Sequence, residues 1–197
     1  IANVESQDSL SWANNGFYYI DLLNGVLIST TSYSIDLHYG ANLISFYALP
    51  EDASLDNVMT SLEGYVTGVI GEGVAASPNP VLGWVGSLDA INPLSGYWVI
   101  VNASSSLDIS EALYTDSASI YDLHYGANLI SFPGENPVAL EDALQGDFVS
   151  SINGIIGEGV AASPNPTLGW VGSLSEIDAA NGYWVKMNDS GILDGSG

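Results

Sequence analysis

The two histidines, His38 and His124, are the side chains best suited to acid–base or metal chemistry at neutral pH. A catalytic or ligating histidine needs convergent partners, and the chain has no His-Glu-x-x-His, no histidine pair at helical spacing and no Gly-x-Ser-x-Gly. Asp36 and Asp122 precede the histidines by two residues, close enough for a local hydrogen bond. We therefore predict structural histidines at strand entries.

Glu72 and Glu158 are the best candidates for carboxylate chemistry. Each stands between two glycines in a copy of the motif Gly-Glu-Gly-Val-Ala-Ala-Ser-Pro-Asn-Pro. A glycosidase would need a second carboxylate roughly 5 to 9.5 Å away within each copy. Flanking glycines more often mark a tight turn or a bulge than an active site. We interpret the motif as a loop and predict a protein with no catalytic residues, not an enzyme.

Metal binding is restricted by the absence of cysteine, which leaves hard oxygen ligands and makes calcium the natural ion. No Asp-x-Asp-x-Asp-Gly loop is present, so we predict no cofactor, leave a calcium site open and expect diffuse binding of divalent cations. Asn102-Ala103-Ser104 and Asn188-Asp189-Ser190 are sequons at equivalent places. Asn102 and Asn188 are therefore candidate glycosylation sites.

Charge excludes several classes of partner. The chain of 197 residues carries 23 acidic residues against a single basic one, a formal net charge of −22. Nucleic acids and anionic membranes bind basic surfaces, so neither is an expected partner. Apolar runs are too short to span a bilayer, so we expect no membrane insertion. Because trypsin-like proteases would find one site, and a hydrated acidic surface tolerates salt, we expect an extracellular or cell-surface protein.

The chain contains an internal duplication. Residues 37–46, LHYGANLISF, recur unchanged at 123–132, an offset of 86. The same offset relates 71–80 to 157–166, 82–88 to 168–174 and 96–99 to 182–185. We predict an N-terminal hairpin segment over 1–34, repeat 1 over 35–110, a linker over 111–120 and repeat 2 over 121–197.

The predicted fold is mainly β, with two tandem homologous β-rich domains, each containing one short helix. Strands are expected over 42–46, 66–70, 82–88 and 97–101, between Gly, Pro and Asn clusters. The copies diverge over 47–67 and 133–153, which we take as a variable face. Leu82, Trp84 and Leu88 fall on one face of a strand, a core pattern.

The short helix lies in the variable segment. In repeat 1, apolar residues at 55, 58, 59 and 62 have helical spacing, with Ser54 as the N-cap and Gly64 as the stop. In repeat 2, Pro137 suits a first helical turn and Gly146 ends the helix.

Asn24-Gly25 stands between two apolar runs and predicts a β-hairpin over residues 16–31. Its GFYY sequence at 16–19 echoes GYWV at 96–99, so it is either the closing strand of an earlier repeat or a hairpin packed on repeat 1.

The aromatic strand 97–101 is the first candidate for contacts between units. Alternation places Trp98 and Ile100 on one face, and repeat 2 carries Trp184 and Lys186 at these positions. We expect this face to be covered by a neighbouring unit in repeat 1 and exposed in repeat 2. The predicted assembly or ligand contacts are Trp98, Ile100, Trp184, Phe17 and Tyr19.

The motifs at the two ends of each unit resemble a repeat domain of large secreted and surface proteins of bacteria and archaea. That domain starts with Gly-Trp-Asn-Leu-Ile-Ser-Leu-Pro and ends with Gly-Tyr-Trp-Ile/Val-Lys, and the resemblance covers residues 35 to about 190. Ala41 and Ala127 stand where the family often has Trp, and Ile100 replaces the closing Lys that Lys186 keeps. The resemblance implies a secreted, modular protein and transfers no catalytic residue.

Together these observations predict an extracellular structural protein that self-associates into a filament, surface layer or adhesin stalk. Exposed strand edges and aromatic faces are expected to be covered by the adjacent unit or subunit. The first alternative is a carbohydrate-binding or adhesive module of a larger secreted protein, for which a glycan would be the partner. The second is a fibre or decoration protein of a virion.

Overall fold

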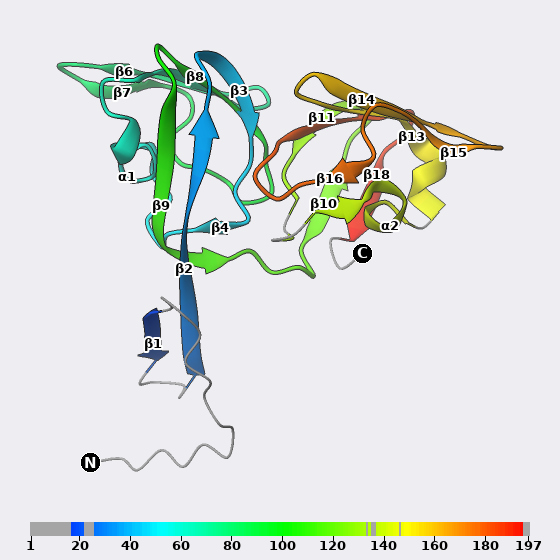
Figure 1. Ribbon diagram of the computed structural model, residues 1–197, viewed down its shortest axis with the longest axis horizontal. Coiled ribbons are helices and arrows are strands. Elements are labelled where there is room, and N and C mark those ends of the chain that lie inside the picture. Colours follow the sequence, from blue (N-terminus) through cyan, green and yellow to red (C-terminus); the bar gives the residue numbers. More distant parts are fainter. Residues whose placement is uncertain (1–16, 22–25, 133, 135–136, 146, 195–197) are drawn as a thin grey trace.

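The computed structural model describes residues 17–21, 26–132, 134, 137–145 and 147–194 (Figure 1). The fold is mainly β, built from antiparallel sheets with a few short helices, as predicted. The N-terminal hairpin is also confirmed, because β1 (Phe17–Asp21) pairs antiparallel with β2 (Val26–Leu37).

Each repeat contributes one five-stranded sheet, and the two sheets have equivalent strand orders. The sheet of repeat 1 has the order β3-β8-β5-β6-β7, with strands Gly40–Ile44, Tyr97–Val101, Val66–Ile70, Ala75–Asn79 and Gly83–Gly86. The sheet of repeat 2 has the order β11-β17-β13-β14-β15, with strands Gly126–Ile130, Tyr183–Met187, Ile152–Gly157, Val160–Asn165 and Gly169–Gly172.

Smaller sheets cover one face of each five-stranded sheet (Figure 1). In repeat 1, β2 and β9 (Ser105–Tyr114) form a long ribbon within the order β1-β2-β9-β4, where β4 is Ala48–Leu49. In repeat 2, β10 (Ile120–Leu123) pairs with β18 (Gly191–Asp194), and β12 (Val138–Ala139) with β16 (Glu176–Ile177). The predicted limits of repeat 1 at residues 35 and 110 fall inside β2 and β9.

The helices are shorter than the spacing predicted. The first forms α1 (Leu55–Val58) followed by the 3₁₀ turn η1 (Thr60–Leu62). Ser54 is the N-cap residue, as predicted, but its side chain makes no capping hydrogen bond. The amide of Leu55 donates instead to the carbonyl of Asp89 in a neighbouring loop, 3.1 Å away, which satisfies a donor of the first turn.

In repeat 2, α2 is Leu140–Ala143 and the turn η2 is Asp147–Ser151, so the placement of Pro137 in a first helical turn was wrong. The two residues before α2 belong to β12 and pair with β16. Gly146 lies outside the described residues.

The core lies between each five-stranded sheet and the elements beneath it. In β8, Tyr97, Val99 and Val101 are buried, whereas Trp98 and Ile100 are half-buried, as the alternation predicted. Two clusters of buried apolar side chains result, centred on the two repeats.

Two other predictions were wrong in part. Residues 71–80 are not only a loop: Ala76 of β6 pairs with Val69 and is buried, which makes this segment part of the sheet. Leu82 is 72% exposed because it lies in the turn between β6 and β7. Leu88 is buried, as predicted, and Trp84 is half-buried against the core.

A buried asparagine fixes the bend that leads into β3. Asn42 Oδ1 accepts from the amide of His38 at 2.8 Å, and Nδ2 donates to the carbonyls of His38 at 2.9 Å and Val99 at 3.3 Å. Asn128 makes the equivalent bonds in repeat 2.

We expect Asn42→Ala to destabilise the fold by about 1–3 kcal/mol, because it leaves buried backbone groups without partners. Urea unfolding measures the change, with Asn57→Ala as control. Asn57 is exposed and its Nδ2 donates one hydrogen bond to the carbonyl of Asp52 at 2.7 Å, so we expect a smaller loss in the control. Equal losses in both variants would contradict the role given to Asn42.

Candidate assembly surface and the contact between the repeats

The edge strand of each five-stranded sheet is covered by the other repeat. On the open side of β3, the carbonyl of Leu43 accepts from the amide of Gly182 at 3.1 Å. The amide of Ser45 donates to the carbonyl of Ala180 at 3.0 Å, and the amide of Leu43 donates to Glu158 Oε2 at 2.7 Å. A side chain and a loop of repeat 2 thus satisfy backbone groups that an edge strand would leave unpaired.

The same contacts occur in the opposite direction at β11. The carbonyl of Leu129 accepts from the amide of Gly96 at 3.1 Å, and the amide of Leu129 donates to Glu72 Oε2 at 2.8 Å. Ser131 N donates to the carbonyl of Leu94 at 3.2 Å. The contact is therefore reciprocal, like a two-fold dimer interface, although both halves belong to one chain.

Two glycines allow this close approach. A Cβ at Gly96 would lie 2.9 Å from the carbonyl oxygen of Ile130, and a Cβ at Gly182 would lie 2.7 Å from that of Ile44. The side chains of Leu43 and Leu129 also lie against these glycines and are 1% and 3% exposed. The glycine that opens each GYWV motif is thus explained by the contact between repeats.

Each histidine forms an ion pair with the glutamate of the other repeat. His38 Nε2 lies 2.6 Å from Glu158 Oε1, and its Nδ1 lies 2.8 Å from the carbonyl oxygen of Tyr39. In the other direction, His124 Nε2 lies 2.5 Å from Glu72 Oε1, and its Nδ1 lies 2.7 Å from the carbonyl oxygen of Tyr125. Both ring nitrogens face groups that only accept when the carboxylate is ionised, so the arrangement fits the doubly protonated imidazolium.

The structural role predicted for the histidines is retained, but their partners differ from the predicted ones. The sequence allowed hydrogen bonds to Asp36 and Asp122, whereas the ring nitrogens bond to glutamates 120 and 52 residues away. Sequence reasoning missed this pairing. The available signal was that the histidine motif and the Gly-Glu-Gly motif are both unchanged between the copies.

This geometry predicts a pH-dependent stability. The hydrogen bond to the Tyr39 carbonyl, and to a lesser extent the one to Glu158, raises the pKa of His38 above its ordinary value of 6.5. The corresponding bonds to the Tyr125 carbonyl and to Glu72 raise the pKa of His124. Because the pKa of each histidine is raised in the folded state, its ion pair contributes fully to the free energy of unfolding below about pH 6.5. This contribution is lost as the pH rises through the folded-state pKa values.

We therefore expect the urea midpoint to fall between pH 6 and pH 9, and two histidine titrations above pH 6.5 by NMR. In a His38→Asn/His124→Asn variant, the urea midpoint should change much less between pH 6 and pH 9. Histidine pKa values at or below 6.5 would contradict the ion pairs.

The outer faces of the two five-stranded sheets are free of carboxylates. We define the outer face as the side of each sheet turned away from its core; in Figure 1 both outer faces lie on the same side of the molecule. The ten strands of the two sheets contain no Asp or Glu, and Lys186 is their only charged residue. The outer faces include Ile70, Val85, Ile156 and Val171, which are 41–48% exposed, and the half-buried Trp98, Ile100 and Trp184.

The structure places three of the predicted contact residues, Trp98, Ile100 and Trp184, on these outer faces. Phe17 and Tyr19 belong to β1, and their side chains lie outside the described part of the chain. The repeats meet through the edges of β3 and β11, in agreement with the expectation that strand edges are covered by the adjacent unit. The Trp98 and Ile100 face does not join the repeats, which corrects the other part of that expectation. The contact is made by hydrogen bonds to the edge backbone groups of Leu43 and Leu129, and not by packing of aromatic faces.

The candidate glycosylation residues are both exposed and directly follow the last strand of each five-stranded sheet in the sequence. Asn102 Nδ2 donates to the carbonyl of Gly64 at 3.0 Å, and Asn188 Oδ1 accepts from Asn153 Nδ2 at 3.0 Å. Glycosylation of these residues stays a prediction.

Within the described ranges, no three His, Asp or Glu side chains gather in a way that could hold a metal ion. None of the helices described is long and apolar enough to cross a membrane. No family description, curated protein or solved structure matches this chain.

Proposed function

We propose that this chain is a non-catalytic structural building block of an extracellular filament, surface layer or adhesin stalk, and that copies of it associate through their outer faces. The observation that carries the proposal is the absence of carboxylates from ten strands in a chain with 23 acidic residues. Interface cores are depleted of charge in the same way.

Electrostatics favours the outer face over other surfaces for contact between copies. Two molecules of charge −22 repel each other wherever their acidic surfaces approach. On the outer face, apolar side chains such as Ile70 and Ile156 can be buried without bringing carboxylates together. A second copy of this chain is therefore the partner that we propose.

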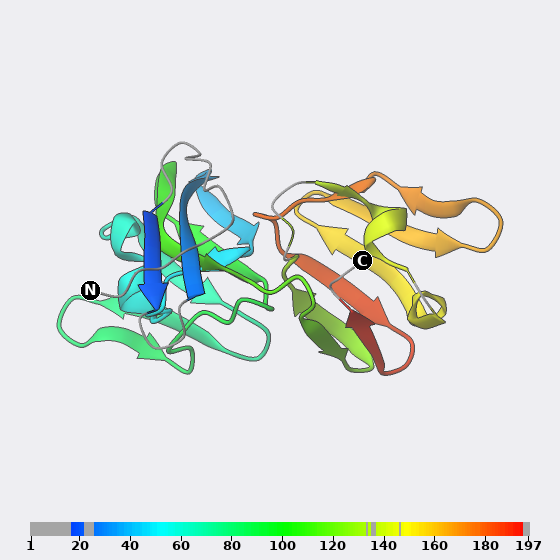
Figure 2. The same ribbon diagram turned by 90° about the horizontal axis from the view of Figure 1, so that it is seen from below.

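The reciprocal contact supports an assembly made from whole chains. It occupies the open edges of β3 and β11 within one molecule, so further growth must use other surfaces. The edges of β7 and β15 are secondary candidates. The turns that precede these strands carry Val81, Leu82 and Leu168, which are 72–86% exposed, and they lie at opposite ends of the molecule (Figure 2).

Composition supports a location outside the cell. A single basic residue limits cleavage by trypsin-like proteases, and the dense carboxylates favour hydration and diffuse binding of divalent cations. Cations would reduce the repulsion between copies, so we expect calcium to promote assembly without a dedicated site. Analytical sedimentation across concentration, with and without millimolar calcium, tests the proposal.

A further inference from the structure

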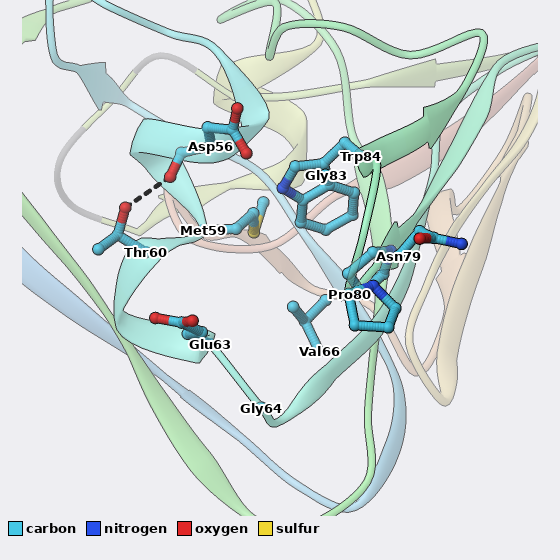
Figure 3. Close-up of a pocket in the computed structure, with 11 residues that line it drawn as sticks. Asp56, Met59, Thr60, Glu63, Gly64, Val66, Asn79, Pro80, Gly83 and Trp84 are labelled. Carbon is cyan, nitrogen blue, oxygen red and sulfur yellow. Dashed lines mark hydrogen bonds between the residues drawn. The ribbon is translucent and has the colours of Figure 1, made fainter.

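A pocket of about 640 Å³ opens in repeat 1 between the α1–η1 segment and the β6–β7 hairpin (Figure 3). It lies outside the contact between the repeats. Its volume falls in the range of pockets that bind small molecules. Six of its lining residues carry the argument: Asp56, Met59, Thr60, Glu63, Asn79 and Trp84.

The pocket combines an apolar floor with a polar rim. Met59 is buried at 2% exposure, and the half-buried ring of Trp84 lies across from the helix that carries Asp56 (Figure 3). Asp56 and Glu63 are exposed and supply carboxylate acceptors. Asn79 Oδ1 is occupied by the amides of residues 81 and 82, at 2.9 and 3.0 Å, which leaves Nδ2 to donate.

The two walls of this pocket differ in how they compare with repeat 2. The hairpin wall is unchanged, since Asn79 and Trp84 correspond to Asn165 and Trp170 at the offset of 86. The helical wall belongs to the divergent segment: Asp56 is kept as Asp142, whereas Thr60 and Glu63 correspond to Gly146 and Val149. A constant aromatic wall facing a polar wall that differs between the copies at Thr60 and Glu63 is the arrangement expected when one scaffold is adapted to a ligand in one copy.

We infer that this pocket binds a saccharide without acidic groups. An indole ring offers an apolar face on which a pyranose ring can lie, and nearby carboxylates, a hydroxyl and an amide can bond its hydroxyl groups. The two rim carboxylates and the charge of −22 disfavour uronic acids, sulfated sugars and phosphates. This inference is independent of the proposed assembly.

Calorimetric titration with neutral oligosaccharides tests the inference. The probes are soluble gluco-, manno-, galacto- and N-acetylglucosamine oligomers, with alginate oligomers as the acidic comparison. We expect at least one neutral oligomer to bind with one site per chain and the acidic oligomers not to bind.

Two variants locate the site. Glu63→Val, which copies the repeat 2 residue at an exposed position, should weaken binding at least tenfold, and Trp84→Phe should also weaken it. Trp170→Phe and Trp98→Phe are matched controls that should bind normally, and urea unfolding verifies that all four variants fold.

Failure of every neutral oligomer to bind would overturn the inference. So would binding that is unchanged in Glu63→Val and Trp84→Phe, or lost in Trp98→Phe. Binding should persist in chains whose outer faces have been changed to block assembly, so the two proposals fail separately.

Discussion

The Gly96→Ala/Gly182→Ala variant is expected to lose the contact between the repeats. Each new methyl group would lie less than 3 Å from a backbone carbonyl oxygen of the other repeat, and backbone cannot rotate away as a flexible side chain can. Overpacking of this kind costs about 1–3 kcal/mol per site. Relief requires the repeats to move apart, which would break the hydrogen bonds at Leu43 and Leu129.

Hydrogen exchange and urea unfolding measure this effect. We expect faster exchange of the amides of Leu43 and Leu129, whose acceptors are the glutamates of the opposite repeat, together with a lower urea midpoint. Gly68→Ala is the matched control. A Cβ at this residue would lie 3.7 Å from the carbonyl oxygen of Ala76 and 3.9 Å from Cδ1 of Ile100, which are ordinary van der Waals contacts. Wild-type exchange at both leucines in the double variant would contradict the contact.

The Ile70→Asp/Ile156→Asp variant is expected to abolish self-association. These two side chains occupy equivalent positions on the outer faces, opposite Trp98 and Trp184 in the register, and are 41% and 48% exposed. Burying an apolar side chain of this size contributes about 1.5–3 kcal/mol. Losing that gain, and placing carboxylates where two copies meet, should weaken association by at least a hundredfold.

Ile120→Asp/Ile192→Asp is the matched control for the outer-face variant. It makes the same two substitutions on β10 and β18, where the isoleucines are 60% and 63% exposed and lie away from the outer faces. Both variants change the net charge equally. We expect the control to associate like the wild type, and equal loss in both variants would show that added charge alone, not the outer face, controls association.

Local patterns were sufficient to predict the strands Val66–Ile70 and Tyr97–Val101 and the alternation of the second strand between two faces. They failed for residues 75–79, because proline and glycine in this motif resemble a loop, while pairing with β5 makes it a strand. Leu82 was misplaced for a related reason: strand alternation was extended beyond the first strand residue, Gly83, into the turn.

The pairing of the histidines with the glutamates could not be predicted from spacing. His38 and Glu158 belong to different repeats, so their proximity depends on how the two sheets meet. That arrangement is set by backbone groups on β3 and β11 and by two glycines without side chains, and hydrophobic periodicity reports neither. The candidate contact residues Trp98, Ile100 and Trp184 were accessible to sequence reasoning because strand alternation alone assigns their face.

The most direct test of the central claim is sedimentation velocity combined with electron microscopy of the wild type, the Ile70→Asp/Ile156→Asp variant and the Ile120→Asp/Ile192→Asp control, across concentration in millimolar calcium. Assembly through the outer faces predicts ordered, concentration-dependent assemblies of the wild type and the control, and a monomeric outer-face variant. A wild-type chain that stays monomeric at every concentration, or an outer-face variant that assembles normally, would contradict it.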